Sequence, residues 1–113
     1  MKISYGTLYL ADLNPRFGTE PGKLRPVVVV QNNLLNEANH PSTWVLPCTT
    51  RVVGENLLRV AIPKNMAGNS EECEVMIDQS RAIDNARFKK MLRPLPKTIV
   101  AEIKEKLRLL ADL

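Results

Sequence analysis

The shortness of its apolar segments constrains the fold of this chain more than any other feature. The longest stretches without a polar side chain are the five residues Pro26–Val30 and the five residues Trp44–Cys48. A membrane-spanning helix needs roughly 20 apolar residues in succession, so none is expected. Short apolar segments separated by turn residues are typical of β strands, and 113 residues suffice for one domain only. We therefore expect a single, mainly β domain over residues 1–113.

The segment after Pro26 is the clearest strand. Four β-branched valines, Val27–Val30, follow this proline, and such a run is stiff at χ1 and suits a strand that is buried on both faces. Residues of high β propensity bounded by turn signals predict the other strands. These lie at Tyr5–Leu13, Thr43–Thr50, Leu57–Ile62, Cys73–Ile77 and Lys90–Arg93.

The last segment predicts an amphipathic helix. Ile99, Ile103, Leu107 and Leu110 recur at spacings of four, four and three residues, and Pro96 suits the first turn. Short strands with one terminal helix predict a small, mostly antiparallel barrel or curled sheet with the helix packed on it. Two shorter helical turns are expected at Leu34-Leu35 and, capped by Asp84, at Asp84–Phe88.

Charge is unevenly distributed along the chain. Residues 1–80 carry seven Lys or Arg and eight Asp or Glu, a net charge of −1, whereas residues 81–113 carry nine against four, a net charge of +5. A basic C-terminal third favours an acidic partner, either a nucleic acid or an acidic protein. The first residues lack the apolar segment and cleavage site of a signal peptide, so we expect a cytoplasmic protein without membrane contact.

Composition excludes several kinds of site. Cys48 and Cys73 are too few and too far apart for a disulfide scaffold or a zinc site, and we expect both as small core residues. A single histidine, His40, excludes a two-histidine acid–base pair. No GxGxxG, Walker, GxSxG or HExxH motif occurs. The Glu71-Glu72-Glu74 cluster is expected to be a solvated face, so no metal site is predicted.

Three clusters of polar residues could carry chemistry. The first is a loop that leads to Arg25, which immediately precedes the valine strand. A guanidinium positioned by a sheet can hold a phosphate through two parallel hydrogen bonds, although a solvated loop cation is the simpler interpretation. The loop also contributes Arg16, Thr19, Glu20 and Lys23.

The second and third clusters each follow a predicted strand. Thr49-Thr50-Arg51 combines hydroxyl donors with a guanidinium, and Asp78-Gln79-Ser80-Arg81 offers an acid and an amide. Each also has a structural interpretation: strand propensity with an exposed charge for the second cluster, and turn or capping chemistry for the third. None of the three clusters decides a function by itself.

In combination, these segments resemble the MazF/PemK/Kid family of toxins from about Gly6 to the terminal helix. The blocks that carry the resemblance follow one another in the order found in that family. They are Gly6–Tyr9, Asp12–Pro15, Gly18–Gly22, Arg25–Asn32, Val45–Thr50 and Asp78–Asp84.

The resemblance implies a homodimer of SH3-like antiparallel barrels, each with a C-terminal amphipathic helix, that cleaves single-stranded RNA without a metal or other cofactor. In that family the ribose 2′-OH attacks its own phosphodiester and leaves a 2′,3′-cyclic phosphate and a 5′-OH. A cognate antitoxin is also implied, whose disordered acidic segment covers the active groove and folds on binding. We therefore expect a growth-inhibiting toxin. Messenger RNA is its preferred target, and ribosomal and transfer RNA are left open as alternatives.

The family's functional residues fall on named positions of this chain. Its arginine falls on Arg25, as general acid or stabiliser of the phosphorane charge, and its strand-end threonine on Thr49. A reaction that adds charge to a phosphate needs fixed donors where that charge develops, and the attacking hydroxyl needs a base. That base is left open between Glu20 and Asp78. Further RNA contacts are expected from Arg16, Phe17, Thr19, Lys23, Thr50, Arg51, Gln79 and Arg81.

The chain departs from the family at two positions, and another function is open to the fold. Thr19 stands where some members carry histidine, and Met76 where some carry a second arginine, so the chemistry of those groups is not carried over. The alternatives are a non-catalytic, gyrase-inhibiting toxin and a homologue that only binds RNA. Gyrase poisoning uses a C-terminal tryptophan segment, whereas the single tryptophan here is Trp44, within a predicted strand.

Overall fold

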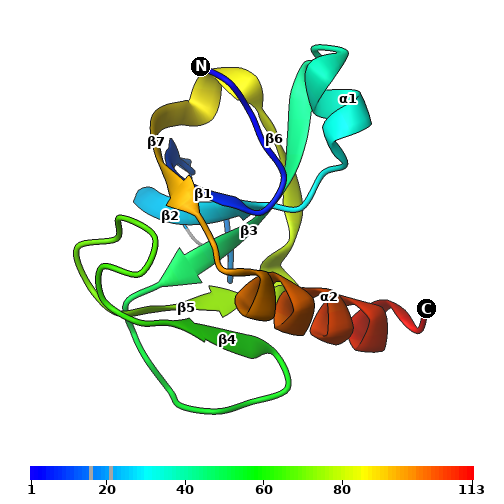
Figure 1. The fold of residues 1–113 in the computed structure, drawn as a ribbon. Coiled ribbons are helices and arrows are strands. Elements are labelled where there is room, and N and C mark those ends of the chain that lie inside the picture. The colour runs from blue at the N-terminus through cyan, green and yellow to red at the C-terminus, as the bar shows by residue number, and fades with distance from the viewer. Residues whose placement is uncertain (16, 21) are drawn as a thin grey trace.

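The computed structural model describes residues 1–15, 17–20 and 22–113 and consists of an antiparallel sheet with one long helix against it (Figure 1). No helix among the described residues has the length and apolar character needed to cross a membrane. The strands are β1 (Thr7–Asp12), β2 (Leu24–Val29), β3 (Ser42–Thr49), β4 (Arg59–Ile62), β5 (Cys73–Met76), β6 (Arg81–Asp84) and β7 (Phe88–Pro94). The helices are α1 (Asn33–Glu37) and α2 (Lys97–Ala111), with 3-10 turns η1 (Ile77–Gln79) and η2 (Asn85–Arg87).

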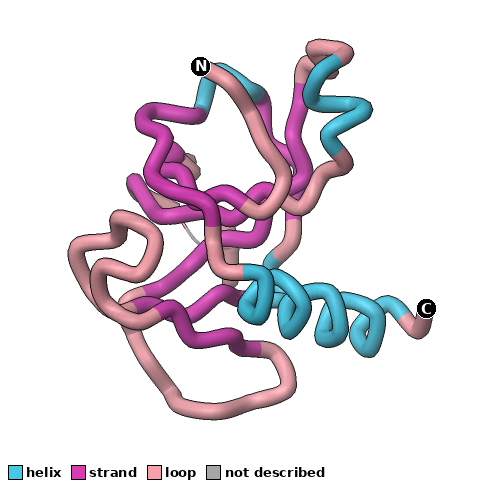
Figure 2. Tube along the Cα trace, viewed as in Figure 1, coloured by secondary structure: helices cyan, strands magenta, loops and turns pink. Residues whose placement is uncertain are grey.

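The sheet has the strand order β4-β5-β3-β2-β1-β7, and β6 also pairs with β3. Every described strand pair is antiparallel, as the sequence predicts, and α2 runs along the side that carries β4 and β5 (Figure 2). The sheet does not close among the described strands, because β4 and β7 remain its two ends. The expected antiparallel sheet with a terminal helix is confirmed, and "barrel" describes it only loosely.

Strand β3 organises the sheet because its two halves pair with different neighbours. Ser42–Val45 pairs with β6, whereas Cys48 and Thr49 pair with β5. Pro47, which has no N–H to donate, falls between these two ladders. This change of partner carries the end of β3 to the β4–β5 side of the sheet.

The valine run divides its side chains between two apolar clusters, which confirms a strand buried on both faces. Val27 and Val29 pack with Tyr9 and Phe88, whereas Val28 belongs to the cluster that contains Ile103 of α2. Cys48 and Cys73 are both buried in that second cluster, as expected. Ile99 and Leu107 also pack against it.

The apolar stripe of α2 ends one turn before the sequence predicts. Leu110 is 48% exposed, so the spacing that correctly identifies the helix overextends its buried face. The reason is that the core below α2 ends at Leu107. Spacing along a helix shows which residues share a face, but it does not show how far the opposing surface reaches.

The secondary structure of residues 77–84 differs from the sequence prediction. Residues 81–84 form strand β6, although Asp78-Gln79-Ser80-Arg81 suggested a turn and only Ile83 of the strand is buried. A four-residue strand with one buried side chain has almost no alternation to detect. The expected helical turn after Asp84 is present as η2, with the Asp84 carboxylate accepting a 2.8 Å hydrogen bond from the Ala86 N–H.

Candidate active site

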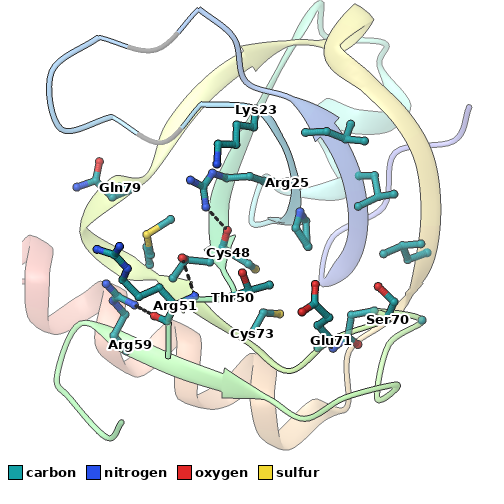
Figure 3. A pocket seen from close by; sticks show the side chains of 18 of the residues that line it. Lys23, Arg25, Cys48, Thr50, Arg51, Arg59, Ser70, Glu71, Cys73 and Gln79 are labelled. Carbon is teal, nitrogen blue, oxygen red and sulfur yellow. Dashed lines mark hydrogen bonds between the residues drawn. The ribbon is translucent and has the colours of Figure 1, made fainter. Parts of the chain in front are cut away.

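A groove with a volume of about 890 Å³ opens where β2, the end of β3 and the β4–β5 pair meet (Figure 3). Five cationic and three acidic side chains line it, so its described lining is cationic overall. A cationic cleft attracts a polyanion and raises its local concentration. The cations are Lys23, Arg25, Arg51, Arg59 and Lys90, and the acids are Glu20, Glu71 and Asp78.

Most of these cations do not come from the basic C-terminal third of the chain. Lys90 is the one residue from positions 81–113 that lends a positive charge to the described lining. The groove is cationic because strand pairing brings together basic residues from four separate segments. The basic C-terminal third and the cationic groove are therefore two separate indications of an acidic partner, because mostly different residues supply the charge in each.

Arg25 is held in the groove by backbone acceptors. It is the second residue of β2, opposite Ala11 of β1. Its Nε donates to the carbonyl of Gly22 at 2.7 Å, and its Nη1 lies 3.4 Å from the carbonyl oxygen of Cys48 on β3. The expectation that the sheet positions this guanidinium is confirmed, although the residue lies within the strand and not before it.

Thr49 and Thr50 close β3 and both line the groove. Thr49 is half-buried, and its Oγ1 accepts a 3.1 Å hydrogen bond from the N–H of Arg51. That bond orients the Thr49 hydroxyl, whose own proton can be donated to a ligand. Thr50 is exposed and lies one residue beyond the strand, so the alternation of neighbouring strand residues does not keep it out of the groove.

The loop before β2 is closed at its base by main-chain and side-chain bonds. The N–H of Leu13 donates to the carbonyl of Lys23 at 2.9 Å, and the N–H of Lys23 donates to Oδ1 of Asn14 at 2.8 Å. Arg87 adds bonds from Nη1 to the carbonyls of Asp12, at 3.0 Å, and Asn14. The loop therefore leaves and rejoins the sheet at one point.

Several residues expected to bind RNA line the groove, and others do not. Thr19 and Lys23 from this loop and Arg51 beside Thr50 belong to the lining, as does Glu20, one of the two candidate bases. Phe17 is exposed outside the described lining, and Arg16 lies outside the described residues.

The segment after β5 is similarly divided between residues that reach the groove and residues that do not. Asp78 and Gln79, in η1, line the groove, Asp78 being exposed and Gln79 half-buried. Arg81 pairs with Val45 inside the sheet and is not part of the described lining. The third sequence cluster is therefore split by the fold: its first two residues reach the groove, and its arginine does not.

Two buried thiols, Cys48 and Cys73, lie in the lining, and Cys48 is next to Arg25. Cys48 hydrogen bonds to Cys73, and this bond together with burial raises the pKa of the Cys48 thiol well above its usual range. The same hydrogen bond lowers the pKa of Cys73. Cys48 therefore stays a neutral thiol at neutral pH and adds no negative charge next to the guanidinium of Arg25.

The structure corrects one sequence expectation at the Glu71-Glu72-Glu74 cluster. Glu71 and Glu72 are exposed, but Glu74 is only 2% exposed and forms an ion pair with Arg59 on β4, Nη1 to Oε1, at 3.1 Å. The solvated-face interpretation is therefore wrong for Glu74. No three His, Cys, Asp or Glu side chains of the described chain gather as a metal ion would require.

Arg59 is a groove residue that sequence reasoning missed. The signal lay with its partner, because Glu74 stands between Cys73 and Val75 in a predicted strand whose cysteine is expected in the core. A carboxylate in such a strand needs a cation or several donors to offset its lost hydration. Sequence alone does not say which of the chain's cations supplies that contact.

Comparison with known proteins places this chain in a family. The family model for the PemK-like, MazF-like toxin of type II toxin–antitoxin systems matches residues 4–111. Endoribonuclease EndoA of Bacillus subtilis is 29% identical over 110 residues, which cover 96% of this chain and 94% of that protein.

Solved structures agree with the sequence match. MazF of Deinococcus radiodurans superposes with a TM-score of 0.85 at 26% identity, covering 100% of this chain and 99% of that one. A MazE–MazF structure from the same organism gives a TM-score of 0.80 at 26% identity, covering 100% and 98% of the two chains. The chain belongs to the family of PemK-like, MazF-like toxins of type II toxin–antitoxin systems.

Proposed function

We propose that this toxin is an endoribonuclease that cleaves single-stranded RNA by attack of a ribose 2′-OH on the adjacent phosphodiester, without a metal or other cofactor. The observation that carries the proposal is the meeting of Arg25 and Thr49 in one cationic groove. The Bacillus subtilis relative is an endoribonuclease by name, which supports the same reaction class. The family resemblance supports the route through the 2′-OH.

The groove offers what the phosphoryl centre requires. As the 2′-oxygen bonds to phosphorus, negative charge builds on the non-bridging oxygens, and fixed donors aimed at that point lower the barrier. Arg25, anchored to the carbonyl of Gly22, supplies a planar cation. Thr49, oriented by the N–H of Arg51, supplies a hydroxyl.

Proton transfers complete the reaction. The 2′-OH loses its proton to a base as its oxygen bonds to phosphorus, and the bond from phosphorus to the 5′-oxygen breaks as that oxygen gains a proton. The products are a 2′,3′-cyclic phosphate and a 5′-OH. Glu20 and Asp78 both line the groove and are the candidate bases, and Arg25 is the candidate acid or charge stabiliser.

We further propose that the toxin is a cytoplasmic homodimer that is neutralised by an antitoxin. The cationic lining is suited to the acidic, disordered segment of such a partner. The MazE–MazF structures of the Deinococcus relative support a partner of this kind. Messenger RNA is the proposed cellular target.

The test is cleavage of a defined, unstructured RNA by purified protein in excess EDTA, with the new ends identified by mass spectrometry. We expect cutting to persist with the chelator, to leave a cyclic phosphate and a 5′-OH, and to stop when the scissile nucleotide is 2′-deoxy or 2′-O-methyl. Arg25→Ala protein, purified in parallel, controls for contaminating nucleases. Activity that needs added magnesium, or unchanged cutting of the deoxy substrate, would overturn the mechanism.

A further inference from the structure

The ion pair of Arg59 and Glu74 has no part in the cleavage scheme above. Figure 3 shows Arg59 beside Arg51, across the opening from Lys23 and Arg25. Arg59 lines the groove, whereas Glu74 lies behind it, almost completely buried. A buried carboxylate must be offset by several donors, and this one has them.

Glu74 binds both the guanidinium and the loop that follows β3. Its Oε1 accepts from the N–H of Val53 at 3.0 Å and from Nη1 of Arg59 at 3.1 Å, and its Oε2 accepts from the N–H of Gly54 at 3.1 Å. Nη1 of Arg59 also lies 3.5 Å from the carbonyl oxygen of Arg51. The side chain of Arg59 is thus held in one orientation from behind.

These bonds leave one edge of the guanidinium unused. Among the described residues, the side-chain hydrogen bonds of Arg59 all pass through Nη1, and none uses Nε or Nη2. The N–H groups of Nε and Nη2 point in parallel, which is the edge that holds two oxygens of a phosphate. The side chain is 22% exposed, so a ligand in the groove can reach it.

We propose that Arg59 is a second phosphate-binding residue of the groove, which contacts an RNA phosphate next to the scissile one, and that Glu74 is its positioning residue. The inference rests on the proposed function, because it takes RNA as the ligand. Two guanidiniums on opposite sides of one groove suit successive phosphates of an extended strand. The ion pair restrains Arg59 before the RNA arrives, which lowers the entropy lost on binding.

The test compares RNA binding by variants, using an oligonucleotide that is 2′-O-methyl at the scissile position. Arg59→Met is combined with Glu74→Gln, so that no unpaired charge remains buried. We expect binding to weaken about tenfold, and the slope of log K against log salt to shrink by about 0.7, the value for one phosphate contact with single-stranded nucleic acid. A purely structural role would leave that slope unchanged.

Matched variants separate this effect from a general loss of charge or of fold. Arg108, on α2 and outside the groove lining, is the control, and Arg108→Met should leave affinity and slope within experimental error. Arg59→Lys keeps the charge and the contact with Glu74 but loses the fork. The Arg59→Lys variant should bind RNA severalfold more weakly than the parent and keep the same salt slope. This variant tests the proposal even if the double variant is unstable.

Strand register allows a rescue experiment. Met76 lies opposite Arg59 in the β4–β5 pair and also lines the groove. Adding Met76→Arg to the Arg59→Met, Glu74→Gln protein returns a guanidinium to this side of the groove, and affinity and salt slope should recover.

Different results would contradict the proposed function and the proposed role of Arg59. A wild-type protein that neither cleaves nor binds RNA contradicts the proposed function. A wild-type protein that cleaves RNA, accompanied by a folded Arg59→Met, Glu74→Gln variant with unchanged affinity and slope, overturns the role of Arg59 alone. Thermal unfolding of each variant establishes that it is folded.

Discussion

The two guanidiniums that face each other across the groove are held in different ways. Arg25 is anchored by the backbone carbonyls of Gly22 and Cys48. Arg59 is anchored by the buried carboxylate of Glu74, which also holds the N–H groups of Val53 and Gly54. Backbone carbonyls therefore hold the guanidinium of Arg25, and a buried carboxylate holds the guanidinium of Arg59.

We therefore expect loss of Arg25 to slow RNA cleavage with little effect on stability, whereas loss of Arg59 should affect both RNA binding and stability. Arg25 is itself half-buried and lines the groove, so water can reach the position that the guanidinium leaves. Glu74 is out of reach of water and loses its cation if Arg59 is removed. An unpaired charge at such a depth costs far more than an unpaired group at the edge of a groove.

The largest expected effect on activity comes from Arg25→Ala. RNA cleavage should fall by at least about 100-fold, the usual scale for losing one fixed donor at the developing charge. Arg25→Lys should recover little of it, because an ammonium does not reproduce the planar fork. The thermal midpoint should stay close to that of the parent, with Arg108→Ala as the control. Retention of half the parent rate would remove Arg25 from the mechanism.

The largest expected effect on stability comes from Glu74→Ala. The free energy of unfolding should fall by about 3 kcal/mol, because Arg59 and two backbone N–H groups lose a buried partner together. Glu72→Ala, an exposed neighbour, should change it by no more than about 0.5 kcal/mol. Urea unfolding of both variants measures the difference. Equal effects would show that the buried pair does not stabilise this side of the groove.

The two threonines sharpen the comparison within the Arg25 side. Thr49→Val should slow cleavage about tenfold or more, because it removes a hydroxyl that is half-buried and oriented by Arg51. Thr50→Val should cost less, since its hydroxyl is exposed and lies beyond the strand. Thr49→Ser retains the hydroxyl and serves as the control, and single-turnover rates compare the variants. The opposite ranking would move the site by one residue.

The smallest and most diagnostic effect concerns the base. We expect Glu20→Gln to depress the rate on the alkaline side of the pH profile more than Asp78→Asn, because Glu20 lies in the groove lining together with Thr19 and Lys23, both expected to contact RNA. With a carboxylate base, the rate rises with pH as the base loses its proton, and the neutral amide removes that rise. If the pH profiles of both variants match that of the parent, neither carboxylate is the base and a water-mediated route is required.

Local sequence was enough to predict most of the secondary structure and several residues of the groove. The valine run indicated β2, the spacing of Ile99, Ile103 and Leu107 indicated α2, and the blocks around Arg25 and Thr49 pointed to the residues that now meet at one opening. These features depend on neighbours in the chain, through χ1 stiffness, helical periodicity and turn chemistry.

Tertiary structure alone decided which other residues reach the groove. Glu74 and Arg59 are 15 positions apart and meet because of the register of β4 against β5, and shifting a strand by one residue would turn its side chains to the opposite face. Arg81 is kept out of the groove by its pairing with Val45, and Leu110 is exposed because the core under α2 ends at Leu107. Propensity and spacing act over a few residues, whereas burial and the choice of a distant partner depend on which surfaces the whole sheet brings together.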